Sequence, residues 1–315
     1  MSNLVEVTRQ GFGSRSKNSL GGALFGFLLV AISAVVLFWN EGRSVKRYKD
    51  LNEGAAKVVS VASDQVNPAN EGQLVHLTGE AITSKPLSDA QFGVSVTAIK
   101  LIRSAEMYQW VENVKTEDRE KVGGSVETTR TYRYAKEWSG SLIDSSQFKD
   151  SNAHRNPASM KYKSSTLVAD DVTVGAFQLP QFLVGKISGS EPLPASSLDG
   201  ASGEIKAAGK LHEGGVYFGA GPLSPVVGDI RVNFSFVPTG TISLVAQQAG
   251  NSFVSYVAST GGKLDPPERS PLSAGELIVP AQQANRLPPR GIRVAGFFLM
   301  MTGFSIILTP LSLHS

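Results

Sequence analysis

The chain has 315 residues, of which 18% are charged, and its formal net charge is +3 at pH 7. This length suffices for one large domain or two small ones besides any membrane segment. The basic residues are scattered rather than clustered, which argues against nucleic acid as a partner. Since the chain contains no cysteine, the sequence excludes disulfides, thiol nucleophiles and cysteine-bound zinc.

The N-terminal part of the chain predicts a membrane anchor. Residues 1–19 are polar, so we expect a short, flexible cytoplasmic tail. Residues 20–39 have no charge and no proline. At about 1.5 Å per residue they reach about 30 Å, the thickness of the hydrocarbon core of a bilayer. Aromatic residues and then charges follow, without a small-residue cleavage site, which favours a retained transmembrane helix over a signal peptide or a buried soluble helix.

Two features of this helix are candidate contact sites. Gly22 and Gly26 form a G-x-x-x-G pair, which can let two helices approach closely but is also common by chance. Just beyond the apolar stretch, Glu41 and Arg43 can pair at reduced dielectric constant. They are either an ordinary interfacial anchor or a fixed clamp between the first helix and the outer domain or other membrane helices.

A second apolar segment, residues 291–313, predicts a second transmembrane helix. Arg293 lies one turn inside it and can extend back to the interface. Pro310 lies near its far end, where a helix break costs little. Because the chain stops at Ser315 without a polar tail, we expect further C-terminal membrane helices beyond this sequence.

The central part of the chain predicts a long β-hairpin. Residues 96–114 and 126–138 are rich in β-branched and aromatic side chains, and a charged, glycine-containing connection separates them. Their aromatic side chains fall on one face of each arm. This stripe is either a cross-strand ladder that stiffens the hairpin or a surface that lies on the membrane or on a partner. Its members are Tyr108, Trp110, Tyr132, Tyr134 and Trp138.

Further strand signals follow the hairpin. Residues 229–236 alternate strictly between apolar and polar side chains, as in a sheet with one wet face. Residues 241–246 and 252–257 continue as a meander. The sequence thus predicts a membrane protein whose mainly β (α+β) extramembrane domain, residues 40–290, is inserted between transmembrane α-helices.

Three segments of this domain have other patterns. Residues 172–187 are apolar around a central proline and predict either a broken helix or a buried strand pair. Residues 191–203 are rich in proline, serine and glycine, which indicates a loop and a candidate subdomain boundary. Residues 273–287 predict a helix that leads towards the second membrane segment.

The sequence contains no recognisable catalytic or metal-binding motif. His212 and Glu213 do not belong to an H-E-x-x-H motif, because no second histidine follows. The nucleophile elbow, the P-loop and G-x-G-x-x-G are also absent from the sequence. We therefore expect no cofactor, no metal and no enzymatic activity, although a triad assembled only by the fold stays open.

Several stretches together resemble the transmembrane protein 43 family, also called LUMA. They are Asn40 to Arg43 (NEGR), Asn70 to His76 (NEGQLVH), Ala105 to Glu112 (AEMYQWVE), Tyr134 to Trp138 (YAKEW), His154 to Pro157 (HRNP) and Val227 to Val232 (VGDIRV). The resemblance implies a short N-terminal tail, one membrane helix, a large extracytoplasmic or lumenal domain and then several membrane helices. Counting basic residues beside the helices would place the loop inside, but the resemblance favours an outside loop.

The resemblance also carries expectations about function and location. Animal members lie in the endoplasmic reticulum and inner nuclear membrane, where they oligomerise and organise membrane protein complexes. We expect a bacterial member, in the inner membrane with its large domain in the periplasm. The partners would be membrane lipid, further copies of the chain and other membrane proteins. The leading hypothesis is a non-enzymatic scaffold; the alternatives are a pore, channel or transport component and a membrane-anchored envelope enzyme.

Overall fold

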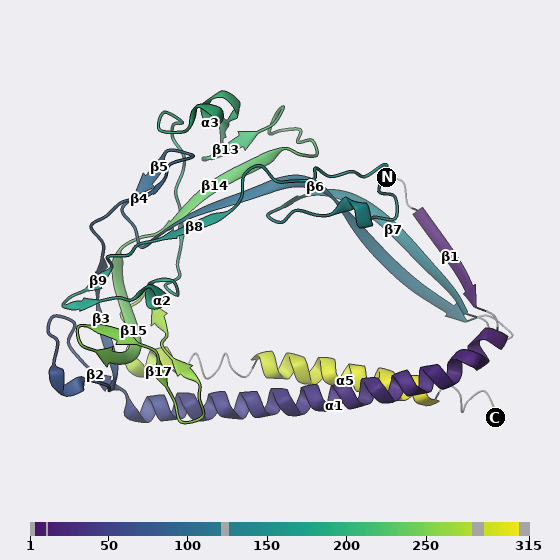
Figure 1. Ribbon diagram of the computed structural model, residues 1–315, viewed down its shortest axis with the longest axis horizontal. Coiled ribbons are helices and arrows are strands. Elements are labelled where there is room, and N and C mark those ends of the chain that lie inside the picture. The colour runs from purple at the N-terminus through teal and green to yellow at the C-terminus, as the bar shows by residue number, and fades with distance from the viewer. Residues whose placement is uncertain (1–3, 11, 121–125, 279–286, 309–315) are drawn as a thin grey trace.

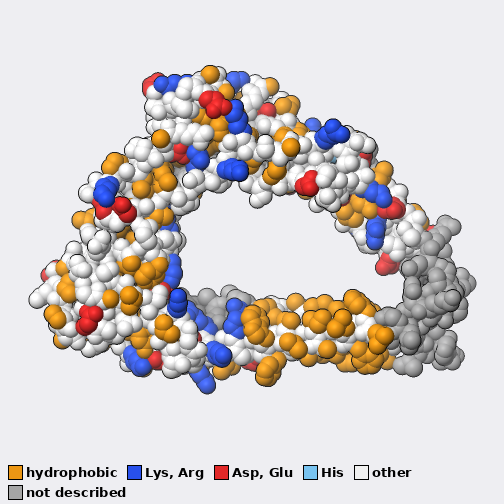
Figure 2. All heavy atoms as spheres, viewed as in Figure 1, with side chains coloured by type: hydrophobic (Ala, Val, Ile, Leu, Met, Phe, Trp, Pro, Cys, Tyr) orange, Lys and Arg blue, Asp and Glu red, His pale blue; other side chains and the backbone are white. Residues whose placement is uncertain are grey.

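The computed structural model describes residues 4–10, 12–120, 126–278 and 287–308. They form a three-sided ring that is open at its centre (Figures 1 and 2). Two helices make one side, a lower β-sheet stands at one end of the helix pair, and an upper sheet sends a long hairpin back towards the other end. This confirms the predicted β-rich domain between two apolar helices.

Helices α1 (Phe12–Lys57) and α5 (Leu287–Leu308) are both long and apolar enough to cross a membrane. Their apolar side chains are largely exposed, as the orange surface in Figure 2 shows; Phe38 is 84% exposed and Phe298 is 65% exposed. The predicted segment 20–39 is only the middle of α1, because the helix continues onto the domain. Of the predicted segment 291–313, residues 309–313 lie outside the described residues.

Residues 4–10 form a strand in the structure, where the sequence had predicted part of a flexible tail. Strand β1 (Leu4–Gln10) pairs antiparallel with β7 (Val126–Ser139), and α1 already begins at Phe12. The physical reason lies in the sequence LVEVTRQ, in which the β-branched Val5, Val7 and Thr8 favour an extended strand.

The lower sheet has the strand order β10-β9-β3-β15-β16, with β2 beside β3 and β19 beside β15. Its centre is the antiparallel pair of β3 and β15, in which Leu77 lies opposite Leu244. Both side chains are fully buried in the lower core, together with the apolar residues of 172–187. The strands are β2 (Val59–Ser60), β3 (Leu74–Ile82), β9 (Thr173–Val174), β10 (Phe177–Gln178), β15 (Gly240–Ala249), β16 (Ser252–Val254) and β19 (Pro267–Glu268).

The upper sheet has the order β1-β7-β6-β14-β13-β12, with β8 beside β6 and β11 beside β14. Alternation in β14 agrees with the predicted strand, since Ile230, Val232 and Phe234 are buried. Its remaining strands are β6 (Lys100–Glu120), β8 (Ser165–Val168), β11 (Glu191–Pro192), β12 (Lys210–His212), β13 (Gly215–Phe218) and β14 (Ile230–Val237). Two small hairpins are β4 (Leu87–Asp89) with β5 (Val94–Val96) and β17 (Tyr256–Val257) with β18 (Lys263–Leu264).

The ambiguous segments form short elements of the lower sheet and the connection to the upper sheet. Residues 172–187 form β9, β10 and the short helix α2 (Gln181–Val184). Along residues 191–203 the chain passes from the lower core, which holds Ile187, to the upper core, which holds Ala201. Helix α3 (Gly203–Ala208) follows, and residues 274–278 are helical as predicted within the described residues. Two 3-10 turns are η1 (Pro68–Asn70) and η2 (Ser145–Gln147).

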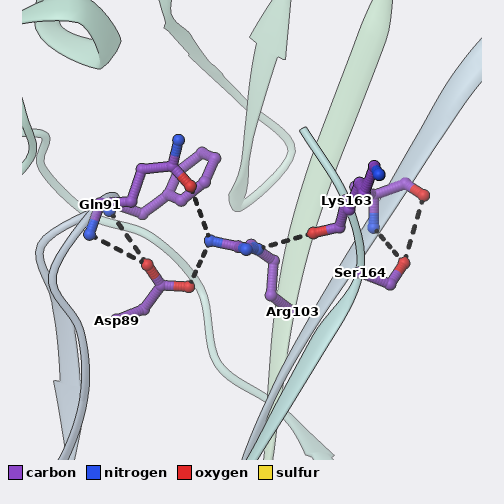
Figure 3. A network of polar contacts seen from close by, with 7 residues as sticks. Asp89, Gln91, Arg103, Lys163 and Ser164 are labelled. Carbon is purple, nitrogen blue, oxygen red and sulfur yellow. Dashed lines mark hydrogen bonds and ion pairs between the residues drawn. The ribbon is translucent and has the colours of Figure 1, made fainter. Parts of the chain in front are cut away.

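A buried ion pair fixes the β4–β5 hairpin on the upper core (Figure 3). The Arg103 guanidinium donates to Asp89 Oδ2 at 2.7 Å, to the Gln91 side chain at 3.1 Å and to the Lys163 carbonyl at 2.9 Å. It also lies over the Phe92 ring, 5.1 Å from its centre. The Arg103 and Asp89 side chains are only 14% and 10% exposed. Each buried charge is therefore stabilised by the opposite charge of its partner.

Candidate functional site

The two apolar helices are packed closely and antiparallel through glycine. A Cβ at Gly26 would lie 2.7 Å from the Gly303 carbonyl oxygen, and one at Gly303 would lie 2.9 Å from the Gly26 carbonyl oxygen. Nearer the domain, a Cβ at Gly296 would lie 2.6 Å from a Leu37 methyl group. These contacts require small residues because the backbones nearly touch. Gly22 lies in α1, but its surroundings are outside the description.

The sequence had suggested that Glu41 pairs with Arg43. In the structure Glu41 pairs with Arg293 of α5 instead. Arg293 donates through Nε to Glu41 Oε2 at 3.1 Å and through a second nitrogen to the same oxygen. Arg43 instead lies over the Trp39 ring, 5.6 Å from its centre. Residues two apart point to different sides of a helix, which explains why Glu41 and Arg43 do not meet. The ion pair therefore joins the two helices at the domain end of their apolar surfaces.

The C-terminal part of α1 is built into the domain. Leu51 is 1% exposed and belongs to a core with Leu74 and Leu264. The buried Asp50 carboxylate accepts a hydrogen bond from the Thr260 hydroxyl at 2.6 Å. Tyr256 also donates to Glu53 at 2.8 Å. A single helix thus runs from the apolar segment into the lower part of the domain without a flexible joint.

The predicted aromatic stripe is present as a ladder along the arm, the part of β6 and β7 that extends beyond Met107. Tyr108 lies opposite Trp138 with ring centres 5.2 Å apart, and Trp110 lies opposite Lys136, whose ammonium is 4.7 Å from the ring centre. Trp138 is also covered by Arg231, 4.6 Å from its ring.

The chain itself covers the middle of this ladder. His154 stacks on Tyr134 with ring centres 3.6 Å apart and meets the edge of Trp110. The Tyr134 hydroxyl donates to Glu112 at 2.7 Å, and burial together with this carboxylate raises the pKa of Tyr134 to about 12. Asn156 accepts from the Trp110 backbone N–H at 2.7 Å and donates to its carbonyl at 3.0 Å. This part of the stripe is therefore an internal contact.

A depression of about 460 Å³ opens beside Trp138 on the upper sheet. Its wall includes Tyr217, whose hydroxyl donates to Asp229; burial and this contact raise the pKa of Tyr217. His212 and Glu213 lie at its rim as part of a tight β12–β13 turn, in which Glu213 and Gly214 have φ of 49° and 75°. Two positive φ values fit a type I′ hairpin turn. A second depression, of about 590 Å³, lies between residues 142 and 158.

Within the described residues, no group of three or more histidine and acidic side chains is arranged to hold a metal ion. Among the described residues, the buried amine of Lys100 donates to the carbonyls of Gly185 and Ile187 at 2.6 and 2.5 Å. Its burial lowers the pKa of the ammonium group. These carbonyls lie at the C-terminal end of α2, so the contact explains Lys100 as part of the fold.

The sequence analysis did not identify the contacts that His154 and Asn156 make with the arm, or the contact that Arg293 makes with α1. His154, Asn156 and Arg293 make their contacts with residues far away in the chain, so local periodicity contains no signal for them. The HRNP stretch carried the only hint for His154 and Asn156, through the family resemblance.

Comparisons with known proteins agree with that resemblance. A family model described as transmembrane protein 43 matches residues 107–314. Transmembrane protein 43 of Rattus norvegicus is 34% identical over 96% of this chain and 78% of the relative. The Homo sapiens protein is 33% identical over 95% of this chain and 76% of the relative. The Drosophila melanogaster homolog is 34% identical over 76% of this chain and 64% of the relative. No solved structure matches the chain. The sequence resemblance is confirmed, and the chain belongs to the transmembrane protein 43 family.

Proposed function

We propose that this chain is a multi-pass, non-enzymatic membrane scaffold, which associates with itself and organises membrane protein complexes through its β domain. Both apolar helices cross the bilayer, and the domain lies on the extracytoplasmic side, which is the periplasm in a bacterial host. The orientation rests on the family resemblance in the sequence. The exposed apolar surface of α1 and α5 supports the membrane anchor.

The observation that carries the proposal is the unbroken run of α1 from its apolar segment into the lower core. Leu51 is buried there, and the buried Asp50 is hydrogen-bonded to Thr260. A domain held in this way keeps a fixed position and direction relative to the membrane helix α1. A scaffold needs this property, because it must present bound partners in a constant geometry.

The test is the mass of the full chain in mild detergent, measured by light scattering with the detergent contribution subtracted. We expect a discrete oligomer with closed symmetry. A monomer at all accessible concentrations would contradict self-association. A matched measurement on Gly303→Leu, which places a side chain against Val30 and the Gly26 backbone, tests whether the oligomer depends on correct helix packing.

A further inference from the structure

Strand β1 occupies one edge of the arm at the end remote from the lower sheet (Figure 1). Its register with β7 runs from Leu4 opposite Tyr132 to Gln10 opposite Val126. The other edge of β7 pairs with β6. This outer edge of β7, Val126–Tyr132, is the feature from which the inference starts.

A membrane-spanning α1 removes β1 from this edge. Strand β1 ends at Gln10 and α1 begins at Phe12, so β1 stays beside the N-terminal end of the helix. If α1 crosses the bilayer, that end lies on the side opposite to the domain. The arm cannot follow it, since exposed charges such as Lys115 and Glu117 would have to lie in the hydrocarbon core. Pairing of β1 with β7 and spanning by α1 therefore exclude each other.

The edge that β1 leaves behind recognises a carboxylate. Glu6 of β1 accepts a hydrogen bond from the Tyr132 hydroxyl at 3.1 Å and an ion pair from Lys149 Nζ at 3.1 Å. Its register partner is Arg130. These contacts lower the pKa of Glu6, as expected when the ionised form is preferred. When β1 is released, the Lys149 ammonium, the Arg130 guanidinium and the Tyr132 hydroxyl lose the Glu6 carboxylate as their neighbour.

The end of the arm also needs a third strand for its stability. In the described residues, strands β6 and β7 pair there only with each other and with β1. A two-stranded ribbon is marginally stable in water, and an open edge is a template for a further strand. The unpaired backbone groups and the side chains of the β7 edge therefore both favour binding of a further extended segment.

We propose that, in the membrane-embedded protein, the β7 edge Val126–Tyr132 binds an extended segment of a partner protein that carries an acidic side chain where Glu6 lies. Strand addition of this kind takes its affinity from main-chain hydrogen bonds and its specificity from alternate side chains. The inference rests on the proposed scaffold function, for which it names the chemistry of the partner.

The experiment uses the full chain in nanodiscs and a fluorescent peptide with the β1 sequence LVEVTRQ as the probe. We expect saturable binding by fluorescence anisotropy, weakened about tenfold when the peptide carries glutamine in place of its glutamate. Lys149→Gln and Tyr132→Phe should weaken it in the same direction. The matched control is Lys115→Gln on the same arm, where Lys115 lies opposite Thr131 and on the other face from Tyr132. No binding, or equal binding of both peptides, overturns the proposal.

A cysteine pair tests the topological step. The chain has no cysteine, so Val7→Cys with Thr129→Cys, which lie opposite each other in the register, can form only one intramolecular disulfide. We expect no such disulfide in nanodiscs, while Leu37→Cys with Gly296→Cys between the helices should form one. An intramolecular 7–129 disulfide in nanodiscs overturns the proposal. A monomer that still binds the acidic peptide would refute only self-association, and an oligomer that does not bind it would refute only this inference.

Discussion

The base and the arm of the domain are built on opposite principles. The base is the lower sheet with the end of α1, and its side chains are buried in continuous cores around Leu244 and Leu51. The arm extends from the upper sheet as paired strands, and its contacts are aromatic rings and polar groups such as Tyr134, His154 and Asn156. The base thus resists any change of position relative to α1, whereas the arm is held mainly at its root and has open strand edges.

The difference shows how one chain combines a fixed anchor with an accessible binding element. Burial in the base is non-directional and sums over many contacts, so it gives rigidity. Hydrogen bonds and ring contacts on the arm are fewer and each contributes only about 0.5–1.5 kcal/mol. Substitutions should therefore have global effects at the base and at the root of the arm, and local effects along the arm.

The largest effect is expected at the buried ion pair below the root of the arm. Arg103→Leu leaves the Asp89 carboxylate buried without its cation and should lower the free energy of unfolding by about 3–5 kcal/mol. Urea denaturation of the full chain in mild detergent, followed by tryptophan fluorescence, measures this change. The control is Lys85→Leu, whose ion pair with Asp170 is exposed and should contribute under about 1 kcal/mol. Equal effects of both variants would contradict this account.

Truncation in the base should come next. Leu51→Ala removes a fully buried side chain where α1 enters the domain and should cost about 2–5 kcal/mol. The same denaturation measurement applies. Leu223→Ala is the matched control, because Leu223 is 91% exposed and its loss should change the free energy by less than about 0.5 kcal/mol.

On the arm the effect should be local. Asn156→Ala removes the side chain that bridges the Trp110 backbone and leaves its N–H and carbonyl without this partner, at a cost of about 1–3 kcal/mol. Hydrogen exchange should become faster along residues 108–114 and 132–138 and stay unchanged in β3 and β15. Faster exchange in the lower sheet as well would show that base and arm open together.

A pH titration sharpens the comparison at the edge of the base. Hydrogen bonds from Thr83 and Ser84 lower the pKa of Asp171 to about 2, below its ordinary value of 3.8. Because the pKa is lower in the folded state, the stabilisation is present above pH 4 and is lost as the pH falls towards 2. The difference in unfolding free energy between the native chain and Asp171→Asn should therefore shrink over this window. A constant difference would refute the assignment.

The smallest effect is expected at the helix ends. Glu41 and Arg293 are each about half exposed, so Glu41→Ala or Arg293→Ala should change the free energy by under about 1 kcal/mol. The double variant Glu41→Arg with Arg293→Glu, which exchanges the two charges, should regain the unfolding free energy that either charge reversal alone removes. If Arg43→Ala lowered the unfolding free energy as much as Arg293→Ala, the Glu41–Arg43 pair suggested by the sequence would be favoured.

The sequence predicted what depends on local pattern. Uniform apolarity identified both membrane helices, and alternation identified β14 and the long hairpin with its aromatic face. It failed where distant contacts decide, as in the extension of α1 to Lys57, which the buried Leu51 stabilises. It also failed for Glu41, since a charged residue on a helix gives no sign of which of several cations it will meet.

The continuity of α1 has a mechanical consequence. A helix of 46 residues is about 69 Å long at about 1.5 Å per residue, so a tilt of about ten degrees displaces one end by about 12 Å relative to the other. A helix pair of fixed apolar length tilts more in a thinner bilayer. Because Leu51 and Asp50 fasten α1 to the lower core, the whole base must turn through the same angle. The domain thereby converts the thickness of the surrounding lipid into an orientation.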